Sequence, residues 1–499
     1  MVIAAVKCRQ VVAGLLAKTH NRTCYSGIAL TTKTKNMETN IPTVVLPAEN
    51  LVATQPVQKE AAANPVATKD RDLTIDAIRG VALCGILLMN IPGFGIHWSE
   101  IYNLVKGPHN TVDFYTFNTI ETFFSGTMRG LFSMLFGAGM VLFTQNKKET
   151  PGGPTVAELY YRRLLLLVGF GLFNAFVLLW WGDILYAYGL AGMLLYPFRK
   201  TAAKWLFVLG VVCIGIGIVK NQWNFSETKA TRVAYLEAVQ AEKEGKKLTP
   251  EQEGAKTEWL NRQNWKPDAD KTKKDITEMR GNYASVWQHY LGRNSNMETW
   301  GMYHGVWDVL CMMFIGMGLF ALGFFTNRLS TSTYAMALLV GYGVGIPVGW
   351  IMVNKGLIAS LDIASYVDTY RMTPEVLYDV KRVCLAIGHA SLVMLVFRSK
   401  LVPWLMKGLA NIGQMAFTNY LMQSIICTII FHGYGMGYYN QLKFHQLYYI
   451  VAGVWVFQII FSAIWLRYFR FGPFEWAWRT LTYGKKQPMR FARAPIAAE

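Results

Sequence analysis

Charged residues are scarce in this 499-residue chain, and the signatures of soluble enzymes are missing from it. Asp, Glu, Lys and Arg make up only 16% of the residues, whereas about 25% is usual for a soluble domain. The sequence contains no phosphate-binding loop, zinc pair, nucleophile elbow or haem signature. Hydrophobic residues make up 53% of it, with 28 Phe and 16 Trp. This balance excludes an ordinary soluble domain and favours many lipid-facing spans.

The cysteines lack the pattern of a metal site or a disulfide framework. All seven are scattered, four of them within apolar runs, so we expect free thiols and no metal. The net charge of +18 could indicate nucleic acid as a partner. The basic residues, however, lie between the apolar runs and in the C-terminal tail, where membrane orientation explains them better. We therefore expect no nucleic acid, and the lipid bilayer as the main partner.

Ten apolar segments are predicted to cross the membrane as helices. Their ranges are 73–91, 127–145, 163–181, 184–198, 204–219, 304–325, 334–353, 381–397, 403–432 and 447–466. The fold class is therefore all-α, a polytopic membrane bundle of about ten helices. The ninth segment is too long for one straight helix, so it is either tilted or preceded by a surface turn. Pro92 and Gly93 are expected to end the first helix.

The distribution of basic residues orients these spans. Both termini lie on one side if the spans number ten, and that side receives most of the basic residues outside the longest loop. They are Lys147, Lys148, Arg162, Arg163, Arg199, Lys200, Lys204, Arg328, Arg398, Lys400, Arg467, Arg470 and Arg479. Because positively charged loops stay in the cytoplasm, both termini are predicted to be cytoplasmic.

The spans divide the chain into five parts. They are an N-terminal extension (1–70), a first membrane half of five spans (71–219), an extracytoplasmic charged helical loop (220–303), a second half of five spans (304–484) and a basic cytoplasmic tail (485–499). The extension ends in a polar, Ala- and Pro-rich lead-in expected to be disordered. Its first 37 residues contain six basic residues and no acid, as in a transit peptide. The alternative is a start codon assigned too far upstream, with Met37 the true beginning.

The long loop 220–303 is predicted to be helical. Thr249-Pro250-Glu251-Gln252 has the pattern of a helix start, with a capping Thr, Pro at the first position and Gln three residues after the cap. The loop is either a solvated helical hairpin or a lid whose Trp residues dock on the membrane surface or over an outer cavity.

The stretch from Arg71 to Pro92 organises the rest of the chain. At 100° per residue, Asp76, Arg79 and Asn90 lie on one stripe of its helix, with the acid and the base at the start. Asn90 is about 21 Å from Asp76 along the axis, at 1.5 Å per residue. Charges at the mouth of a span are functional candidates by default. The alternative is a topological anchor among lipid headgroups.

Further candidates lie near the predicted outer face. His304 and Asp308 are four residues apart at the start of a span, so they share a helical face. A carboxylate there can orient the imidazole to take a proton from an acceptor hydroxyl, or the contact can be merely structural. Asp183 follows Trp180-Trp181-Gly182 in a turn, where it either caps the next helix or holds an acceptor hydroxyl. Arg129 either joins helices or lines a cavity.

Several segments carry a resemblance to a known family. DAIRGVALCGILLMNI (76–91) resembles the opening span of the YeiB family of bacterial inner-membrane proteins, whose activity is undefined. Three further segments match that family's pattern: RGLFSMLFGAGMVLF (129–143), RRLLLLVGFGLFNAFVLLWWGDILYAYGLAGMLL (162–195) and IGQMAFTNYLMQSIICTIIFHGYGMG (412–437). The last of them continues to FRFGPFEWAWRTLTYG (469–484). Together they cover most of residues 72–484.

The resemblance implies a transmembrane acyltransferase of the bacterial inner membrane. The YeiB family is grouped with enzymes that include heparan-alpha-glucosaminide N-acetyltransferase and the bacterial O-acetylators of surface sugars. The implied substrates are cytoplasmic acyl-CoA as donor and an extracytoplasmic acceptor such as a cell-envelope sugar. Arg79, held in position by Asp76, would then bind donor phosphates, and Arg129 is a further candidate for the donor site. A carrier for a small anionic solute and a non-catalytic membrane protein are the alternatives, and a homo-oligomer stays open.

The sequence departs from the O-acetylators at one position. In those enzymes the first helix carries Arg or Lys followed eleven residues later by His, but the eleventh residue after Arg79 is Asn90. Asn cannot act as a general base, although it can serve as an oxyanion donor or hold an acceptor hydroxyl. The base must then come from another helix or from the following loop, where His97 is the nearest in sequence. The candidates for catalysis are therefore His304, Asp308, Asn90, Asp183 and His97.

Overall fold

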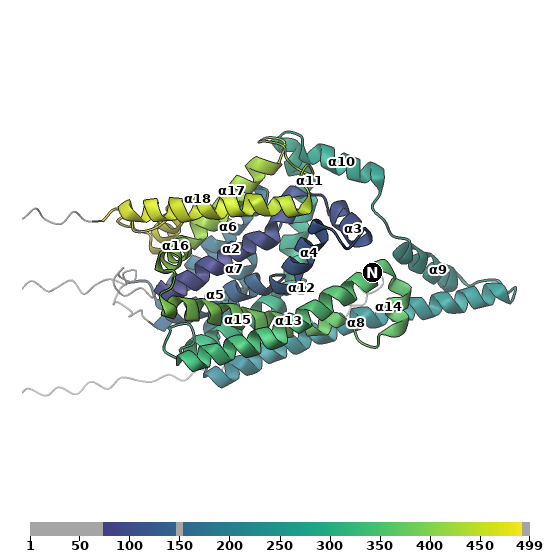
Figure 1. Ribbon diagram of the computed structural model, residues 1–499, viewed down its shortest axis with the longest axis horizontal. Coiled ribbons are helices and arrows are strands. Elements are labelled where there is room, and N and C mark those ends of the chain that lie inside the picture. The colour runs from purple at the N-terminus through teal and green to yellow at the C-terminus, as the bar shows by residue number, and fades with distance from the viewer. Residues whose placement is uncertain (1–72, 146–152, 492–499) are drawn as a thin grey trace, which may run out of the picture. The chain divides into compact units, whose positions relative to one another are not determined.

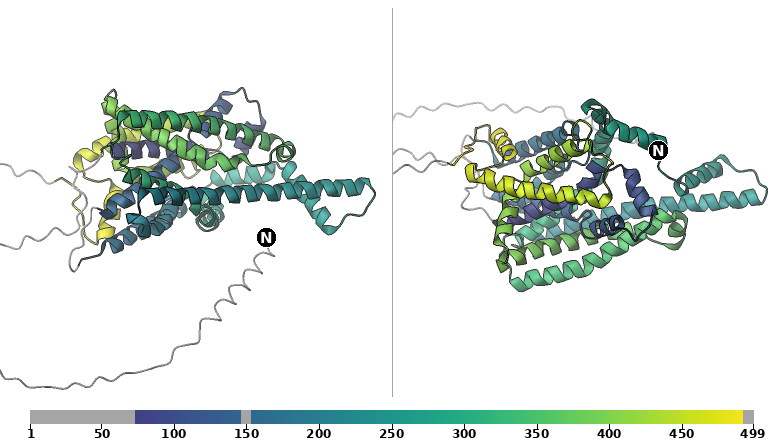
Figure 2. Two further views of the ribbon diagram at one scale, coloured as in Figure 1. Left: turned by 90° about the horizontal axis from the view of Figure 1, so that it is seen from below. Right: turned by 45° about the horizontal axis from the view of Figure 1, so that its top comes forward.

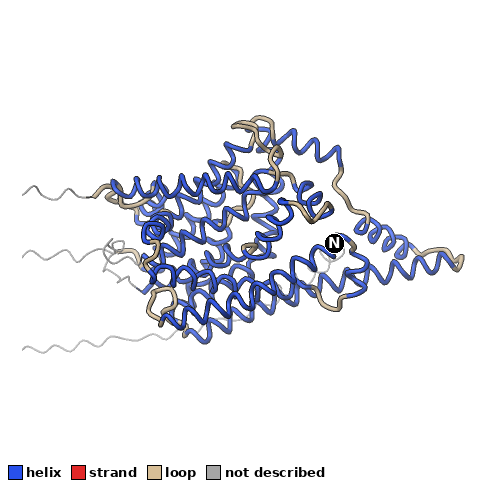
Figure 3. The backbone as a smooth tube through the Cα atoms, viewed as in Figure 1, coloured by secondary structure: helices blue, strands red, loops and turns tan. Residues whose placement is uncertain are grey.

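The described part of the chain is built from helices packed side by side (Figure 1). The computed structural model describes residues 73–145 and 153–491. Within these ranges the regular elements are all helices (Figure 3), and β pairing is limited to an isolated bridge between Phe469 and Arg490. This confirms the predicted all-α class. The expectations for residues 1–70 lie outside the described residues.

Among the described residues, seven stretches are long and apolar enough to cross a membrane, which identifies a membrane protein. They are Leu73–Gly95, Val112–Gln145, Ala203–Lys243, Tyr283–Ala321, Thr331–Leu361, Pro374–Ser399 and Phe444–Tyr468. The shorter apolar helix Ala416–Phe431 adds to these. The helices are α2 (Leu73–Gly95), α3 (Trp98–Lys106), α4 (Val112–Phe123), α5 (Thr127–Gln145), α6 (Val156–Phe176), α7 (Leu185–Leu195), α8 (Ala203–Lys243), α9 (Pro250–Gln263), α10 (Ala269–Met279), α11 (Tyr283–Asn296), α12 (Met302–Ala321), α13 (Thr331–Leu361), α14 (Ile363–Thr369), α15 (Tyr378–Ser399), α16 (Pro403–Gln414), α17 (Ala416–Phe431), α18 (Leu447–Tyr468) and α19 (Pro473–Tyr483). Short 3₁₀ or π turns occupy Tyr196–Lys200, Met297–Gly301, Pro374–Leu377 and Phe444–Gln446.

Each of the ten predicted spans falls on a helix or a pair of helices, although the number of crossings stays a prediction. Several boundaries differ, and three of the differences change how the helices are arranged. The first helix does not end at Pro92: α2 continues to Gly95, since the missing N–H of proline removes only one hydrogen bond. The fifth helix does not end at 219, because α8 runs on to Lys243. The ninth predicted span is broken at Met415, between α16 and α17.

Exposed aromatic residues mark two levels on the surface of the bundle. On α8, Trp205 and Trp223 are both exposed and 18 residues apart, which is about 27 Å along a helix. On α18, Tyr449 and Tyr468 are exposed and 19 residues apart, about 28 Å. Trp and Tyr gather at both surfaces of a hydrocarbon layer about 30 Å thick. The spacing of the two pairs thus matches the thickness of a membrane. The helix α8 continues beyond Trp223 to Lys243, and Figure 2 shows it projecting from the bundle.

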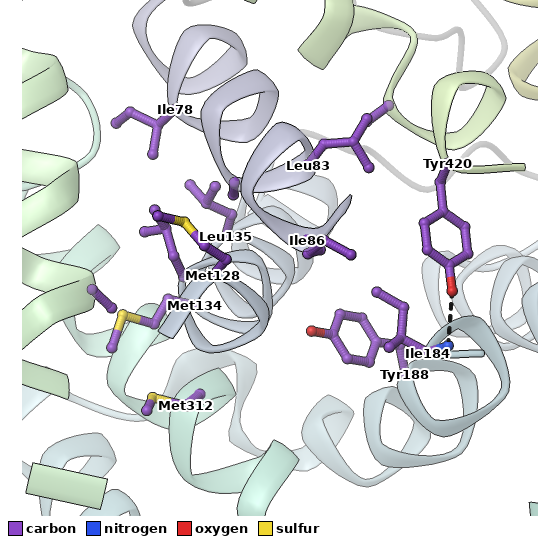
Figure 4. Packing of buried hydrophobic residues seen from close by; sticks show 14 of the residues in the cluster. Ile78, Leu83, Ile86, Met128, Met134, Leu135, Ile184, Tyr188, Met312 and Tyr420 are labelled. Carbon is purple, nitrogen blue, oxygen red and sulfur yellow. Dashed lines mark hydrogen bonds between the residues drawn. The ribbon is translucent and has the colours of Figure 1, made fainter. Parts of the chain in front are cut away.

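The helix α2 lies in the middle of this packing. Its side chains Ile78, Leu83 and Ile86 are buried in the core that Figure 4 shows, opposite side chains of α5, α7 and α12. The helix α16 approaches α2 so closely that a Cβ on Gly413 would lie 1.8 Å from the carbonyl oxygen of Asp76. Small residues permit such contacts between membrane helices. The start of α2 is therefore held against α16.

The long loop 220–303 is helical, as predicted. Thr249 caps α9 with the reciprocal hydrogen bonds of a capping box to Gln252. The α9 residue Trp259 is fully buried in a small separate cluster with Phe225 of α8 and Tyr366. The loop is thus a packed set of helices, not a fully solvated one.

Candidate functional site

The Leu73 end of α2 carries a charged pair that the sequence singled out. The Arg79 guanidinium donates a hydrogen bond to Asp76 Oδ1, 2.7 Å away. The Asp76 side chain is almost completely buried, whereas that of Arg79 is 25% exposed. The carboxylate therefore fixes the guanidinium while leaving part of it accessible.

Two more arginines join Arg79 at this end of the bundle. Arg163, on α6, lies close enough to Arg79 and to Arg479, on α19, for their positive charges to act on each other. The Arg163 guanidinium stacks on the Trp478 ring at 3.9 Å, and that of Arg479 stacks on Phe471 at 4.3 Å. We call Arg79, Arg163 and Arg479 the arginine cluster. Stacked guanidinium groups are held in fixed orientations, which suits the recognition of phosphate.

A groove runs along α6 beside the arginine cluster. It encloses about 670 Å³ and is lined by Arg162, Leu165, Leu166, Gly169, Phe170, Phe173 and Leu481. The lining is apolar apart from Arg162, which pairs with Glu158 at 2.5 Å. A groove of this kind accepts a hydrocarbon chain more readily than a polar group.

The predicted pairing of His304 with Asp308 is not found among the described residues. Asp308 instead lies 2.8 Å from Arg129 and 2.5 Å from Arg382, and Arg382 also contacts Asp379 at 2.5 Å. His304 is exposed and its ring faces Trp300. His304 and Asp308 are four residues apart on one helix, as the sequence predicts, but in the tertiary structure Asp308 pairs with two arginines from other helices. The interpretation of Arg129 as a group that joins helices agrees with this contact.

Asp183 lies in the turn between α6 and α7 and makes contacts on both carboxylate oxygens. Oδ2 accepts a hydrogen bond from the Tyr186 N–H at 2.9 Å, as expected for a cap. Oδ1 accepts from Asn174 Nδ2 at 2.8 Å and from the Tyr420 hydroxyl at 3.3 Å. Burial raises the pKa of Asp183 to about 7 despite these donors. The carboxyl group is therefore part of the packing of three helices.

At its Gly95 end α2 meets His97, which caps α3. His97 is buried; its Nδ1 lies 2.8 Å from Ser99 Oγ and its Nε2 lies 3.4 Å from Asp275 Oδ2. Burial lowers the pKa of His97 although Asp275 lies beside it. Both ring nitrogens are thus occupied by protein groups. Asn90, one turn and a third before Gly95, is partly buried.

Sequence reasoning missed a second His–carboxylate pair at the Gly95 end. His445 Nδ1 lies 2.7 Å from Asp113 Oδ1, which also accepts a hydrogen bond from the His445 backbone N–H at 2.8 Å. Both side chains are about one-quarter exposed. The two residues are 332 positions apart, so no spacing in the sequence could reveal them. This contact is the orienting arrangement that a general base requires, because it leaves Nε2 directed away from the carboxylate.

A polar cavity of about 240 Å³ adjoins this pair. Its lining consists of Ile96, Glu100, Asn103, Leu104, Gly107, Pro108, Thr111, Asp113, Leu442, Lys443 and Phe444. Asp113 therefore faces the cavity and holds His445 at the same time. Glu100, Asn103 and Lys443 supply groups that can hydrogen-bond a hydroxylated ligand.

The apolar helices, with polar sites at both the Leu73 end and the Gly95 end of α2, define a polytopic helical membrane protein. The chain belongs to the family of YeiB and YxaH, proteins without a known function. It is 30% identical over 441 residues to the uncharacterized protein YxaH of Bacillus subtilis, which covers 85% of this chain and 97% of that protein. It is 30% identical over 425 residues to the uncharacterized protein YeiB of Escherichia coli, which covers 83% of this chain and 96% of that protein.

Two further comparisons agree with this family. Residues 319–485 match a domain described as a protein of unknown function (DUF418). An uncharacterized 39.9 kDa protein from the amylase 3′ region of Bacillus acidopullulyticus is 35% identical over 101 residues, 20% of this chain and 29% of that protein. No solved structure matches the chain.

Proposed function

We propose that this protein is an integral-membrane acyltransferase of the bacterial inner membrane. It would transfer an acyl group from cytoplasmic acyl-CoA to the hydroxyl of an extracytoplasmic acceptor such as a cell-envelope sugar. The observation that carries the proposal is that α2 has a basic site at one end and a histidine–carboxylate site at the other. The arginine cluster lies at one end, and the His445–Asp113 pair with its polar cavity lies at the other.

The arginine cluster suits the donor. Three guanidinium groups, two of them stacked on aromatic rings, can bind the phosphates of a coenzyme A ester. The Leu73 end of α2 is the one predicted to face the cytoplasm, where acyl-CoA is found. Arg79 and Asn90 are eleven residues apart, or about 17 Å along the helix. The acyl-bearing arm of the donor would therefore lie along α2, towards Asn90.

The Gly95 end suits the acceptor. The acceptor hydroxyl would bind in the polar cavity, and His445 Nε2 would take its proton while Asp113 orients the imidazole. The hydroxyl oxygen attacks the thioester carbonyl carbon, so a C–O bond forms as the C–S bond breaks. The CoA thiolate leaves and takes the proton from the imidazolium. The Asn90 amide is available to stabilise the negative charge on the carbonyl oxygen.

Acyl-CoA binding by the purified full-length protein tests this function. We expect saturable binding of radiolabelled acetyl-CoA that Arg163→Lys weakens at least tenfold, because a lysine cannot make the bidentate contacts of a guanidinium. Arg199→Lys is the matched control, since Arg199 lies at the same end and stacks on Tyr196 outside the cluster. A protein that binds no acyl-CoA, or whose Arg163→Lys variant binds it equally well, would contradict the proposal.

One observation favours a second candidate, a carrier for a small anionic solute. Arg129 and Arg382 lie within the bundle with Asp308 and Asp379, and charges inside a membrane bundle are often part of a solute path. The Arg129 side chain is 43% exposed, so its guanidinium is not enclosed by its partner Asp308. Flux of an anionic solute into vesicles, without acyl-CoA binding, would favour the carrier.

A further inference from the structure

Four side chains that the proposed reaction does not use meet at the Gly95 end of the bundle. His289 Nδ1 lies 2.9 Å from Glu278 Oε2 and 3.9 Å from Asp275 Oδ1. His97 Nε2 lies 3.4 Å from Asp275 Oδ2. Each side chain is one-third exposed or less. Two imidazoles and two carboxylates thus share a small, partly enclosed volume.

The fold brings these residues together from three segments. Asp275 and Glu278 are three residues apart on α10, so their side chains share a face of that helix. His289 comes from α11, which packs beside α10, and His97 from the cap of α3. Because His97 and His289 are far apart in the sequence, no sequence motif reveals these four residues as a group.

We propose that His97, Asp275, Glu278 and His289 bind one divalent transition-metal ion, with zinc as the best match. Zinc accepts both imidazole nitrogen and carboxylate oxygen and favours four ligands in a tetrahedron. Ligand bonds of about 2.0–2.1 Å place tetrahedral ligand atoms about 3.3 Å apart. The ligand atoms of Asp275, Glu278 and His289 all lie within 4.8 Å of one another, so small side-chain rotations would close them around an ion.

The surroundings of His97 suit a metal ligand. Its Nδ1 accepts a hydrogen bond from the Ser99 N–H at 3.3 Å as the cap of α3, and Ser99 Oγ lies 2.8 Å from the same nitrogen. Nε2 is directed at Asp275 Oδ2, 3.4 Å away. A cation bound between these two groups would displace the proton from Nε2. The proton would then lie on Nδ1, where Ser99 Oγ can accept a hydrogen bond from it. A ligating histidine usually donates its other N–H to a neighbouring group in this way.

His432 provides an independent observation beside the cluster. It is fully buried, and among the described residues neither of its ring nitrogens has a hydrogen-bond partner. Its ring lies 5.8 Å from that of Tyr290, the neighbour of His289 in the chain. A buried polar group left without a partner costs about 1–3 kcal/mol. In the proposed site, water bound to the ion would supply a partner for this imidazole.

The proposed ion would fasten the long loop to the end of α2. Its ligands join the connection after α2 to α10 and α11. A ligand that binds only the folded state stabilises it. The ion would therefore fix the start of α3, whose Glu100 and Asn103 line the polar cavity. Its binding does not depend on the proposed acyl transfer.

Metal content and zinc titration of the full-length protein in detergent test this site. After removal of metal with a chelator, we expect one zinc ion per chain to bind and to raise the thermal unfolding temperature. His289→Ala and the isosteric Glu278→Gln should each weaken zinc binding at least about 100-fold, and Ser99→Ala about 10- to 100-fold, as for partners of a ligand. His109→Ala is the matched control, because His109 lies on the same connection and its ring contacts the Val105 carbonyl and Phe114, away from the proposed ligands.

Cobalt provides a second readout. Co²⁺ in a tetrahedral site with nitrogen and oxygen ligands has a characteristic visible absorption, which Glu278→Gln should abolish in a protein that elutes as the wild type does. Absence of stoichiometric zinc and cobalt binding by the wild type would overturn the site. Equal zinc affinity in the wild type and in both Glu278→Gln and His289→Ala would overturn it as well.

Discussion

The guanidinium of Arg382, which is only 1% exposed, lies 2.5 Å from a carboxylate oxygen of Asp308. Asp308 also bonds Arg129, on a third helix, at 2.8 Å. These contacts connect α5, α12 and α15, and they determine that Asp308 stabilises the bundle and does not orient His304.

The first prediction concerns this network. Asp308→Ala leaves the buried Arg382 without one of its two carboxylate partners, and breaking a buried ion pair costs about 3–5 kcal/mol. We expect a clear fall in the unfolding temperature in detergent. His304→Ala, at an exposed position one turn away, should change stability by less than about 0.5 kcal/mol. Equal stability of the two variants would show that Asp308 does not hold the helices together.

The second prediction assigns the general base. His445→Ala should lower turnover about 10²–10⁴-fold while leaving acyl-CoA binding intact, since removal of a general base usually has this effect. Asp113→Asn should lower turnover as well, because it removes the carboxylate that orients the imidazole. His304→Ala is the control and should stay within a few-fold of the wild type. If His304→Ala abolishes turnover and His445→Ala does not, the base belongs on α12.

The third prediction separates two roles for Arg79. If it is only a topological anchor, Arg79→Lys retains function, because orientation depends on charge and not on geometry. If it binds a donor phosphate, the lost charge-assisted bonds cost about 1.5–3 kcal/mol, about 10- to 150-fold in affinity. We expect normal insertion with at least tenfold weaker acyl-CoA binding. Asp76→Asn should have the same direction of effect, since Asp76 holds the guanidinium at 2.7 Å.

The fourth prediction concerns topology. Single cysteines introduced at Arg199 and Arg479, on a background without native cysteines, should react with a membrane-impermeant reagent only from the cytoplasmic side. A cysteine at Lys247, beyond the end of α8, should react only from outside. The reason is that the exposed Trp205 and Trp223 are expected to lie at the two membrane surfaces. Residue 199 precedes the first and residue 247 follows the second, so the two positions are expected on opposite sides. Reaction of position 247 from the cytoplasm would reverse the orientation proposed here.

Much of the fold could be predicted from local patterns. Apolar segments of about 20 residues specify membrane helices because each backbone group must be bonded within its own helix. The helix from Thr127 to Gln145 agrees with its predicted span residue by residue. The capping box at Thr249 was recognisable because all of its partners lie within four residues. The Asp76–Arg79 contact is likewise one turn of a helix.

Long-range contacts were not predictable in this way. The ends of α2 and α8 were placed too early, because neighbouring helices and not the local pattern stabilise their last turns. Asp308 looked like a partner for His304 at four residues' distance, but arginines 179 and 74 positions away lie nearer to it in space. The spacing of residues along a helix predicts which side chains share a face, but it does not predict which residues of other helices pack against that face.

The sequence by itself determined the class of protein, its family and the charged end of α2, since composition, helical period and neighbour spacing are local properties. Only the tertiary structure decided which side chains form sites. His445 with Asp113, and His97 with Asp275, Glu278 and His289, come from segments brought together by the packing of the helices. Polar side chains in a membrane bundle hydrogen-bond to polar groups on neighbouring helices, and only the packing of the helices decides which groups these are.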